Sequence, residues 1–287
     1  MNIRPITTAD TENCGRTMYE AFCSIDDLRQ LPRDIPNVET GMHLAQVCIN
    51  TPEIYGFAAE DDGGKFLGSN FLWEHDTIRG VGPITIDPNV QSKGIGRRLM
   101  QAVIERGKDA PGIRLVQGAY NLVSMSLYAD LGFEIVEPLV IMEGTPTGEI
   151  SSNSAEVRPL EEKDLAECND LCRKVHGFDR ANELKQISQM FPSFVAERDG
   201  RIVAYTSAPV SWQMNHAVAE TTEDMQDLLL GATKQIGQPL AFIIPTRQAE
   251  LFRWCLKSGL RVSKALTLMV MGEYQNPKGA FLPSVLY

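Results

Sequence analysis

The spacing of apolar and polar residues predicts an alternation of strands and helices in the first half of the chain. Strands are expected at 2–5, 55–60, 66–74, 78–86, 113–119 and 133–141, and helices at 38–49, 96–106 and 124–131. Thr7 and Asp10 form a capping-box pattern for a further helix that ends near Phe22. Gly80, Gly82 and Pro83 fall inside the fourth strand, where they predict a bulge or a sheet edge. This order is typical of an α/β fold with a mixed sheet.

The second half of the chain repeats the first. Ile3-Arg4-Pro5-Ile6 is echoed by Val157-Arg158-Pro159-Leu160, and Asp10 by Asp164, at a constant offset of 154 residues. Phe57-Ala-Ala-Glu60 is echoed by Phe194-Val-Ala-Glu197. Near the end of each half comes an amphipathic helix closed by a glycine, Gly132 and then Gly259. Self-similarity in the same order indicates a duplicated domain.

A small, polar segment without an apolar period separates the two copies. It covers residues 144–156, from Gly144 to Glu156, and has the composition of a linker. The predicted organisation is therefore a domain at 1–143, a linker at 144–156 and a second domain at 157–287. Two halves of this size can each bury a core.

Charge and composition exclude several classes of function. The net charge is −10, and residues 1–143 hold 12 Lys+Arg against 20 Asp+Glu, so a nucleic-acid partner is not expected. The acidic excess serves solubility alone or attracts a cationic amine to a cleft. No apolar run is long enough to span a bilayer, and no membrane partner is expected.

Cysteine and histidine spacing gives no metal site. The six cysteines contain no Cys-x-x-Cys pair, and the four histidines lack ligand spacing, so no metal is expected. Scattered cysteines without a secretory signal favour a reduced, cytoplasmic location.

The most informative stretch is the glycine-rich segment after the fourth strand. Asp87-Pro88 ends the strand, and the string Gln91-Ser-Lys93-Gly94-Ile95-Gly96 leads into a helix. Backbone N–H groups at a helix N-terminus have no intrahelical partner and lie at the positive end of the dipole, so they bind anions. Glycine also lets a phosphate approach the backbone closely. The segment therefore predicts a phosphate site.

The two common nucleotide motifs do not fit this segment. A dinucleotide loop needs a third glycine at the position of Leu99, and a Walker loop needs Lys-Ser or Lys-Thr where Arg97-Arg98 stand. The string Gln91-x-x-Gly94-x-Gly96 after a strand that ends in Asp-Pro instead resembles the coenzyme A pyrophosphate loop of the GNAT (GCN5-related) N-acetyltransferase superfamily.

The resemblance implies a set of residues for acetyl-CoA. Thr85 and Ile86 would face the acetyl-pantetheine arm, and backbone N–H groups of the loop would hold the pyrophosphate. The set so implied for the cofactor is Thr85, Ile86, Gln91, Lys93, Gly94, Ile95, Gly96, Arg97, Asn121 and Ser126. Arg97 and Arg98 add side-chain charge, or Arg98 lies on a solvated helix face. Asn121 bonds the pantetheine arm or only caps the next helix.

A second segment strengthens the resemblance and supplies the expected catalytic acid. Residues 121–133, from Asn121 to Phe133, resemble the family's Asn-x-x-(Ser/Ala)-x-x-Leu-Tyr-x-x-x-Gly-Phe pattern, in which the tyrosine hydroxyl points toward the thioester sulfur. Tyr128 holds that position. A phenol with a pKa of about 10 is protonated at neutral pH and can donate to the departing thiolate. Val123, Leu127 and Leu131 step by four and are expected to form the buried stripe of the helix.

No general base is evident. The strand before the loop offers no carboxylate, and Glu74, His75 and Asp76 are expected to be solvated turn residues. Water, or an acceptor amine that binds in its neutral form, would suffice.

The second half lacks both parts of the site. No Gln-x-x-Gly-x-Gly string follows the strand expected at 204–210, and the next helix begins with Thr222-Glu223-Asp224, which places acid where a phosphate needs positive charge. If Gly259 corresponds to Gly132, Cys255 stands in the place of Tyr128. This half resembles a degenerate GNAT repeat.

The resemblance implies an α/β protein of two GNAT-like domains, each a mixed, mostly antiparallel twisted sheet flanked by helices. The expected activity is transfer of an acetyl group from acetyl-CoA to a primary amine of a small molecule or peptide, by direct attack in a ternary complex. The alternatives are a non-catalytic acyl-CoA sensor or scaffold and a transferase for another acyl-CoA. The chain would act as a monomer or homodimer.

Overall fold

A computed structural model describes residues 1–90, 94–148 and 155–286. The first half contains strands β1 (Asn2–Pro5), β2 (Ile54–Glu60), β3 (Phe66–Trp73), β4 (Arg79–Val81), β5 (Thr85–Ile86), β6 (Gly112–Gly118) and β7 (Glu134–Gly144), with helices α1 (Thr11–Arg29), α2 (Val38–Asn50), α3 (Ile95–Gly107) and α4 (Leu122–Asp130). The second half contains strands β8 (Glu156–Pro159), β9 (Phe194–Arg198), β10 (Arg201–Thr206), β11 (Ala217–Ala219), β12 (Leu240–Pro245), β13 (Arg261–Gly272) and β14 (Ala280–Leu282), with helices α5 (Leu165–His176), α6 (Ala181–Met190), α7 (Thr222–Ile236) and α8 (Ala249–Lys257). The predicted α/β order is confirmed.

The N-terminal motif of each half forms the same ion-pair network. In the first half, Arg4 binds Asp10 at 2.8 Å and Glu60 at 2.7 Å. In the second half, Arg158 binds Asp164 at 2.7 Å and Glu197 at 2.9 Å. In both halves the aspartate also accepts a hydrogen bond from the backbone N–H three residues before it, at 2.8 Å. The sequence echo at an offset of 154 therefore marks one structural unit that occurs twice.

The C-terminal part of each half repeats in the same way. Helices α4 and α8 both have nine residues, and their first residues are 127 positions apart. The first residues of strands β7 and β13 are also 127 positions apart. Gly132 and Gly259, which follow the two helices, both have φ of +102°, a conformation that favours glycine. The predicted correspondence of Gly259 with Gly132 is thus confirmed by backbone geometry.

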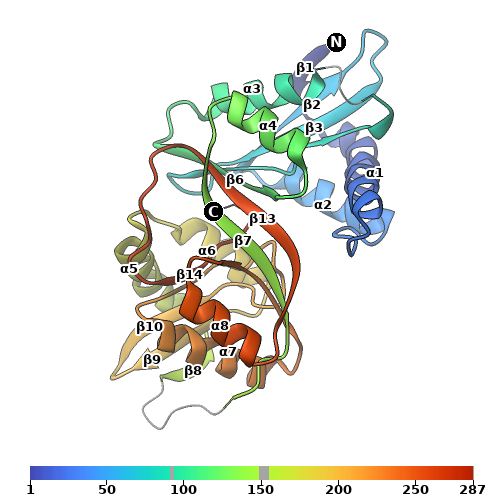
Figure 1. Ribbon diagram of the computed structural model, residues 1–287. Helices are drawn as coiled ribbons and strands as arrows, with labels where there is room; N and C mark the ends of the chain where they lie inside the picture. The colour runs from blue at the N-terminus through green and yellow to red at the C-terminus, as the bar shows by residue number, and fades with distance from the viewer. Residues whose placement is uncertain (91–93, 149–154, 287) are drawn as a thin grey trace.

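The two halves exchange their long strands. The larger sheet has the order β1-β2-β3-β4-β6-β13-β7-β12, with β5 paired to β3, so β13 of the second half lies between β6 and β7 of the first. In return, β7 pairs with β12 of the second half, from Leu240↔Gly144 to Pro245↔Leu139. Figure 1 shows β7 in green and β13 in red as long neighbouring strands that run between the two halves. Among the described residues, only β4 and β6 pair in parallel.

Because of this exchange, backbone hydrogen bonds cross the division predicted from sequence. The ranges 1–143 and 157–287 describe the two repeats along the chain, but the larger sheet contains strands of both. Part of the predicted linker is also strand, since β7 ends at Gly144 and β8 begins at Glu156. The boundaries at residues 143 and 157 therefore remain a prediction about the two sequence repeats.

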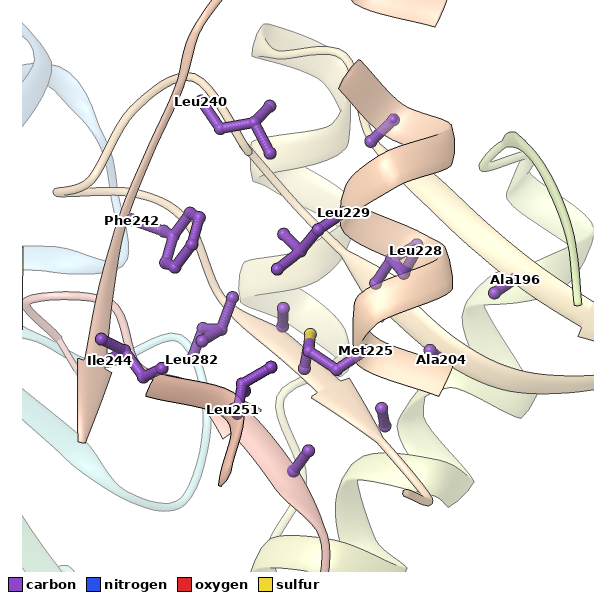
Figure 2. Packing of buried hydrophobic residues seen from close by; sticks show 14 of the residues in the cluster. Ala196, Ala204, Met225, Leu228, Leu229, Leu240, Phe242, Ile244, Leu251 and Leu282 are labelled. Atoms are coloured by element: carbon purple, nitrogen blue, oxygen red, sulfur yellow. The ribbon is translucent and has the colours of Figure 1, made fainter. Parts of the chain in front are cut away.

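A five-stranded antiparallel sheet, β14-β11-β10-β9-β8, belongs to the second half alone. The core beneath it is apolar and fully buried, with Met225, Leu228 and Leu229 of α7 packed against Phe242 and Ile244 of β12. Figure 2 shows Leu282 of β14 beside Ile244 and Leu251 in this core. β11 corresponds to β4, but its partner is β14 rather than β12. Apolar side chains therefore fill the place where the first half leaves a gap, described below.

Two local expectations are wrong. Helix α1 continues to Arg29 rather than ending near Phe22, and its C-terminus then reaches the second half. Glu74, His75 and Asp76 are not simply solvated: Glu74 pairs with Arg106, and the Asp76 carboxylate accepts hydrogen bonds at 3.2 and 3.1 Å from the first backbone N–H groups of α6. His75 contacts Gln186 of the same helix. The turn is a contact between the halves, which local sequence does not reveal.

A buried ion-pair cluster also joins the halves. The Lys264 ammonium of β13 lies 2.8 Å from Asp26 Oδ1 on α1 and 2.6 Å from Asp34 Oδ1. The side chains of Lys264 and Asp26 are each 2% exposed. Removing one partner from such a cluster leaves buried charge without compensation, which is costly.

We expect Lys264→Met to lower the free energy of unfolding by about 3–5 kcal/mol, because two buried carboxylates lose their shared cation. Urea denaturation measures this difference. Lys257→Met, on the exposed face of α8, removes the same charge and should change stability by less than about 0.5 kcal/mol. Equal stability of the two variants would contradict the role given to the cluster.

Candidate acetyl-CoA site

The site begins where two parallel strands part. β4 and β6 are paired only at Arg79↔Ile113 and Gly80↔Arg114. Beyond these pairs, β5 keeps its partner β3 on one edge, through Gly68↔Ile86 and Ser69↔Thr85. Its other edge faces the gap that opens toward β6. A strand edge of this kind presents free backbone N–H and C=O groups to a ligand.

A bulge interrupts the strand at this point, as the sequence predicts. Between the pairs Leu72↔Val81 and Ser69↔Thr85, β3 advances three residues and the facing strand advances four, so one residue is extra. Gly82 has φ of +134°, which favours glycine, and Pro83 has no N–H for a ladder. The Trp73 indole N–H donates to the Gly82 carbonyl at 2.7 Å and holds the bulge in place.

A cavity of about 240 Å³ occupies the gap. Its walls come from the bulged strand, from β6, from α1 and α4, and from the second half. The lining residues are Ala21, Phe22, Ile25, Asp34, Ile35, Leu44, Trp73, Val81, Gly82, Pro83, Ile84, Thr85, Leu115, Val116, Gln117, Gly118, Tyr120, Asn121, Ser124, Tyr128, Trp212, Gln213, Met214, Leu266, Val285 and Leu286. Three sequence-predicted site residues, Thr85, Asn121 and Tyr128, thus face one cavity.

Tyr128 is the buried residue of α4 and lies at this cavity. Its side chain is 5% exposed and packs edge-on against Phe133, with ring centroids 6.3 Å apart. Burial raises the pKa of Tyr128 to about 12, while a hydrogen bond with Ser124 acts in the opposite direction. The phenol therefore keeps its proton at neutral pH.

The predicted buried stripe of α4 is wrong at Val123, whereas Leu127 and Leu131 are partly buried and pack against the core that contains Tyr128. Val123 is 79% exposed, and Tyr128 takes the inward position instead. Gly132 ends the helix in a left-handed conformation, and the next strand begins at once, so the ring of Tyr128 turns toward β6 rather than outward. The error comes from the shortness of the helix, because nine residues leave its apolar period poorly defined.

The polar residues of this segment take distinct places. Asn121 caps α4, since its Oδ1 accepts a hydrogen bond from the Ser124 N–H at 3.2 Å, and it also lines the cavity. Both functions considered for Asn121 are thus compatible. Ser126 is exposed, and its hydroxyl donates to the Leu122 carbonyl at 2.8 Å. Ser124, not Ser126, is the serine that faces the cavity.

The glycine loop leads into a helix N-terminus suited to an anion. Gly94 is the N-cap of α3, with φ of +78°, no capping side chain, and no acidic residue in the first turn. The first intrahelical bond runs from the Arg98 N–H to the Gly94 carbonyl, so the N–H groups of Ile95, Gly96 and Arg97 precede it. Gln91 and Lys93, also predicted for the cofactor, lie outside the described residues.

The arginines of α3 are engaged with the protein. Arg97 pairs with Asp130 at 2.5 Å, and Arg98 donates to the Met1 carbonyl at 2.8 Å. Arg97 therefore offers its backbone N–H to a ligand more directly than its guanidinium. Ile95 and Gly96 are buried, and Gly96 packs close to Ile86 of β5, which brings the helix N-terminus next to the strand edge.

The corresponding helix of the second half is closed to an anion. α7 begins with Thr221, whose hydroxyl accepts a hydrogen bond from the Asp224 N–H at 3.1 Å. Glu223 and Asp224 add negative charge in the first turn. Cys255, in the place of Tyr128, is fully buried, and burial raises the pKa of its thiol to about 12. Neither feature suits an acyl-CoA site.

Sequence patterns do not identify the cavity residues that come from distant segments. Asp34 and Tyr120 belong to no motif, and Trp212, Met214 and Leu286 come from the second half. Gln117 of β6 donates to the Thr267 hydroxyl of β13 at 2.6 Å, a contact that exists only because β13 inserts beside β6. These residues are brought together by the strand exchange, which has no local signal.

The described residues contain neither a metal-binding cluster nor a membrane-spanning helix. In residues 1–90, 94–148 and 155–286, no group of three or more His, Cys, Asp or Glu side chains could hold a metal ion. Within the same ranges, no helix is both long and apolar enough to cross a bilayer. All six cysteines are buried free thiols.

Comparison with known proteins supports the family resemblance. Residues 22–133 match the model of the acetyltransferase (GNAT) family. A stretch of 88 residues is 31% identical to UPF0157 protein YqkA of Bacillus subtilis, covering 31% of this chain and 26% of YqkA. The chain thus spans only about a quarter of that relative's length.

Solved structures are similar over the whole chain. A putative acetyltransferase from Pyrococcus horikoshii has a TM-score of 0.76 and 16% identity, covering 100% of this chain and 95% of its own. A tandem GNAT protein from the clavulanic acid biosynthesis pathway has a TM-score of 0.59 and 11% identity. The match covers 96% of this chain and 99% of that protein's chain. At 16% and 11% sequence identity, the similarity to these structures concerns the fold alone. Residues 22–133 therefore match the GNAT acetyltransferase family, and the chain as a whole shares the fold of these solved acetyltransferases.

Proposed function

We propose that the protein is an acetyl-CoA-dependent N-acetyltransferase with one active site, in the first half of the chain. One observation carries the proposal: the Tyr128 side chain lies at the cavity where β5 and β6 part, and the open N-terminus of α3 packs against β5 beside it. A thioester held along the strand edge would then have an anion site at one end and a proton donor at the other.

The residues fit coenzyme A along this path. The N–H groups of Ile95, Gly96 and Arg97 would hold the pyrophosphate, and Gln91 and Lys93 remain proposed partners from the loop. The free edge of β5 at Thr85 and Ile86 would pair with the amides of the pantetheine arm, as an added strand does. Asn121 would donate its side-chain amide to the same arm, and Ser126 would contact it from the surface of α4.

The reaction would proceed by direct attack in a ternary complex. The amine nitrogen forms a bond to the acetyl carbonyl carbon, and the carbon–sulfur bond breaks. The sulfur takes the electron pair and receives the proton of the Tyr128 hydroxyl, so CoA leaves as a thiol. The attacking nitrogen loses one proton to water, and the tyrosine is reprotonated from solvent. The products are an acetamide and free CoA.

The raised pKa of Tyr128 keeps the phenol protonated until this step. With a pKa of about 12, the phenol is fully protonated over the neutral range and does not compete as an anion for the cavity. A phenol is a weaker acid than a thiol, so it does not protonate the thioester sulfur in the ground state and shares its proton only as negative charge grows on that sulfur. Its contribution therefore belongs to the transition state.

Gly96→Asp should weaken acetyl-CoA binding at least tenfold, or about 1.4 kcal/mol, because it adds a negative charge at the proposed pyrophosphate site. Isothermal titration calorimetry measures the affinity. Gly148→Asp makes the same change at an exposed position, where a Cβ meets only Leu230 at an ordinary 3.6 Å, and should leave the affinity unchanged. Equal affinity of wild type and Gly96→Asp would remove the loop from the site.

Tyr128→Phe should lower kcat by about 10²–10⁴-fold with little change in acetyl-CoA affinity, since the ring and its packing remain and only the donor is lost. The assay follows free thiol released from acetyl-CoA with a panel of amines. Tyr55→Phe removes a phenol outside the cavity and should keep wild-type kcat. If Tyr128→Phe matches wild type within twofold, another group supplies the proton. Absence of turnover by wild type with every amine would favour a non-catalytic acyl-CoA sensor.

A further inference from the structure

We infer that the acceptor is a cationic amine on a small apolar body, and that its ammonium group pairs with Asp34 inside the cavity. The inference rests on the proposed function, because it names the substrate that this acetyltransferase site would take.

One part of the cavity wall is apolar and comes from both halves. Phe22 and Ile25 of α1 face it from the first half, and Trp212, Met214 and Leu286 face it from the second. Aromatic and branched side chains bind an apolar body through the area that they remove from water. Among these five side chains only the Trp212 indole N–H is a hydrogen-bond donor, and Gln213, next to it in the chain, adds one amide, so this wall offers few partners to a sugar, a peptide backbone or a second charged group. The acceptor's body is therefore apolar.

Asp34 is the single charged side chain among the described residues that line the cavity. It is held in place by Lys264, whose ammonium lies 2.6 Å from its Oδ1, and by its own backbone N–H, which donates to the Asp26 carboxylate at 3.0 Å. Its side chain is 14% exposed. A carboxylate fixed at the wall of an otherwise uncharged cavity selects a positive group in the ligand.

The charges around Asp34 leave room for one more cation. Lys264 supplies one positive charge, whereas Asp26 and Asp34 supply two negative charges. Glu143 of β7 lies close enough to add a further negative influence, and Tyr120, which also faces Asp34, is a neutral phenol. Buried charge without a partner is costly, so a second ammonium beside Asp34 would be stabilised. Burial also raises the pKa of Asp34, while Lys264 opposes that change.

This arrangement gives the excess of acidic residues in the first half a specific role in binding the acceptor. Bulk negative charge would attract any cation to the protein, but only an amine with an apolar body could enter this cavity and leave its ammonium at Asp34. The ammonium must first lose one proton to water, which leaves the neutral amine that attacks the thioester, and the nitrogen then loses its second proton to water as in the proposed reaction.

Binding can be measured without turnover. Trp73 and Trp212 line the cavity, so tryptophan fluorescence of the CoA-loaded protein can follow titration with benzylamine, a cation at neutral pH, and with benzyl alcohol, its neutral counterpart of equal size. Wild type should bind benzylamine at least tenfold more tightly than benzyl alcohol. Asp34→Asn should remove this preference and leave benzyl alcohol binding unchanged.

The variant is chosen so that it folds. Asn has the shape of Asp, and Asp34→Asn leaves Lys264 paired with Asp26 at 2.8 Å as a neutral couple. Asp27→Asn is the matched control, because it removes one negative charge at the exposed end of α1, where Asp27 pairs with Arg33 outside the cavity. It should keep the preference for benzylamine. Thermal unfolding confirms that both variants are folded.

Three results would overturn the inference: equal binding of benzylamine and benzyl alcohol by wild type, an undiminished preference in Asp34→Asn, or tighter binding of putrescine, a dication without an apolar body, than of benzylamine. Failure of wild type to bind any of the probes also counts against it. The proposed function fails separately, when wild type releases no thiol from acetyl-CoA with any amine. An enzyme that acetylates putrescine well would keep the proposed function and lose this inference.

Discussion

The parting of β5 from β6 is the constraint on which the candidate site depends. Two parallel residue pairs hold β4 to β6, and the one-residue bulge at Gly82 then turns the strand away. The gap leaves one edge of β5 unpaired, and the cavity lies between this edge and β6. α3 and α4 follow the parted strands in sequence, so their ends reach the same gap. The anion site and Tyr128 thus meet because the backbone ladder stops after two pairs.

The exchange of β7 and β13 closes the other side of this gap. β13 pairs with β6 over seven residue pairs, from Leu266↔Gly118 to Gly272↔Gly112, which keeps β6 in the sheet although β4 leaves it early. The same strand carries Lys264 to Asp26 and Asp34. The second half therefore supplies part of the cavity wall and also fixes the carboxylate within it. In that half the matching gap is filled, since β14 pairs with β11 and its side chains join the core.

Several features of the fold and site are predictable from the residues alone. The repeat at an offset of 154 has a physical basis in the Arg4–Asp10–Glu60 network, which the second half reproduces. The broken strand at Gly82-Pro83 is predictable because proline and a positive φ interrupt a ladder. Gly94 and Gly96 likewise predict the start of α3, because glycine permits a positive φ, as at Gly94, and a close approach of other groups to the backbone. Each of these signals is local in sequence.

Features that depend on contacts between distant segments are not predictable in this way. The position of β13 between β6 and β7 has no signature in either strand, and therefore the pairing of Lys264 with Asp34 has none. The turn at Glu74 to Asp76 has the composition of a solvated loop, yet Asp76 caps α6 of the other half. In α4 the inward position belongs to Tyr128 rather than to Val123, because a nine-residue helix is oriented by its ends and not by its apolar period.

We propose that the gap between β5 and β6 is the single acetyl-CoA site of the chain. A crystal structure of the protein with CoA tests it most directly. We expect one CoA per chain, with its pyrophosphate at the N–H groups of Ile95 to Arg97, its pantetheine arm along Thr85 and Ile86, and its sulfur near the Tyr128 hydroxyl. A pyrophosphate bound at the N-terminus of α7, or a pantetheine arm outside the gap, would contradict it.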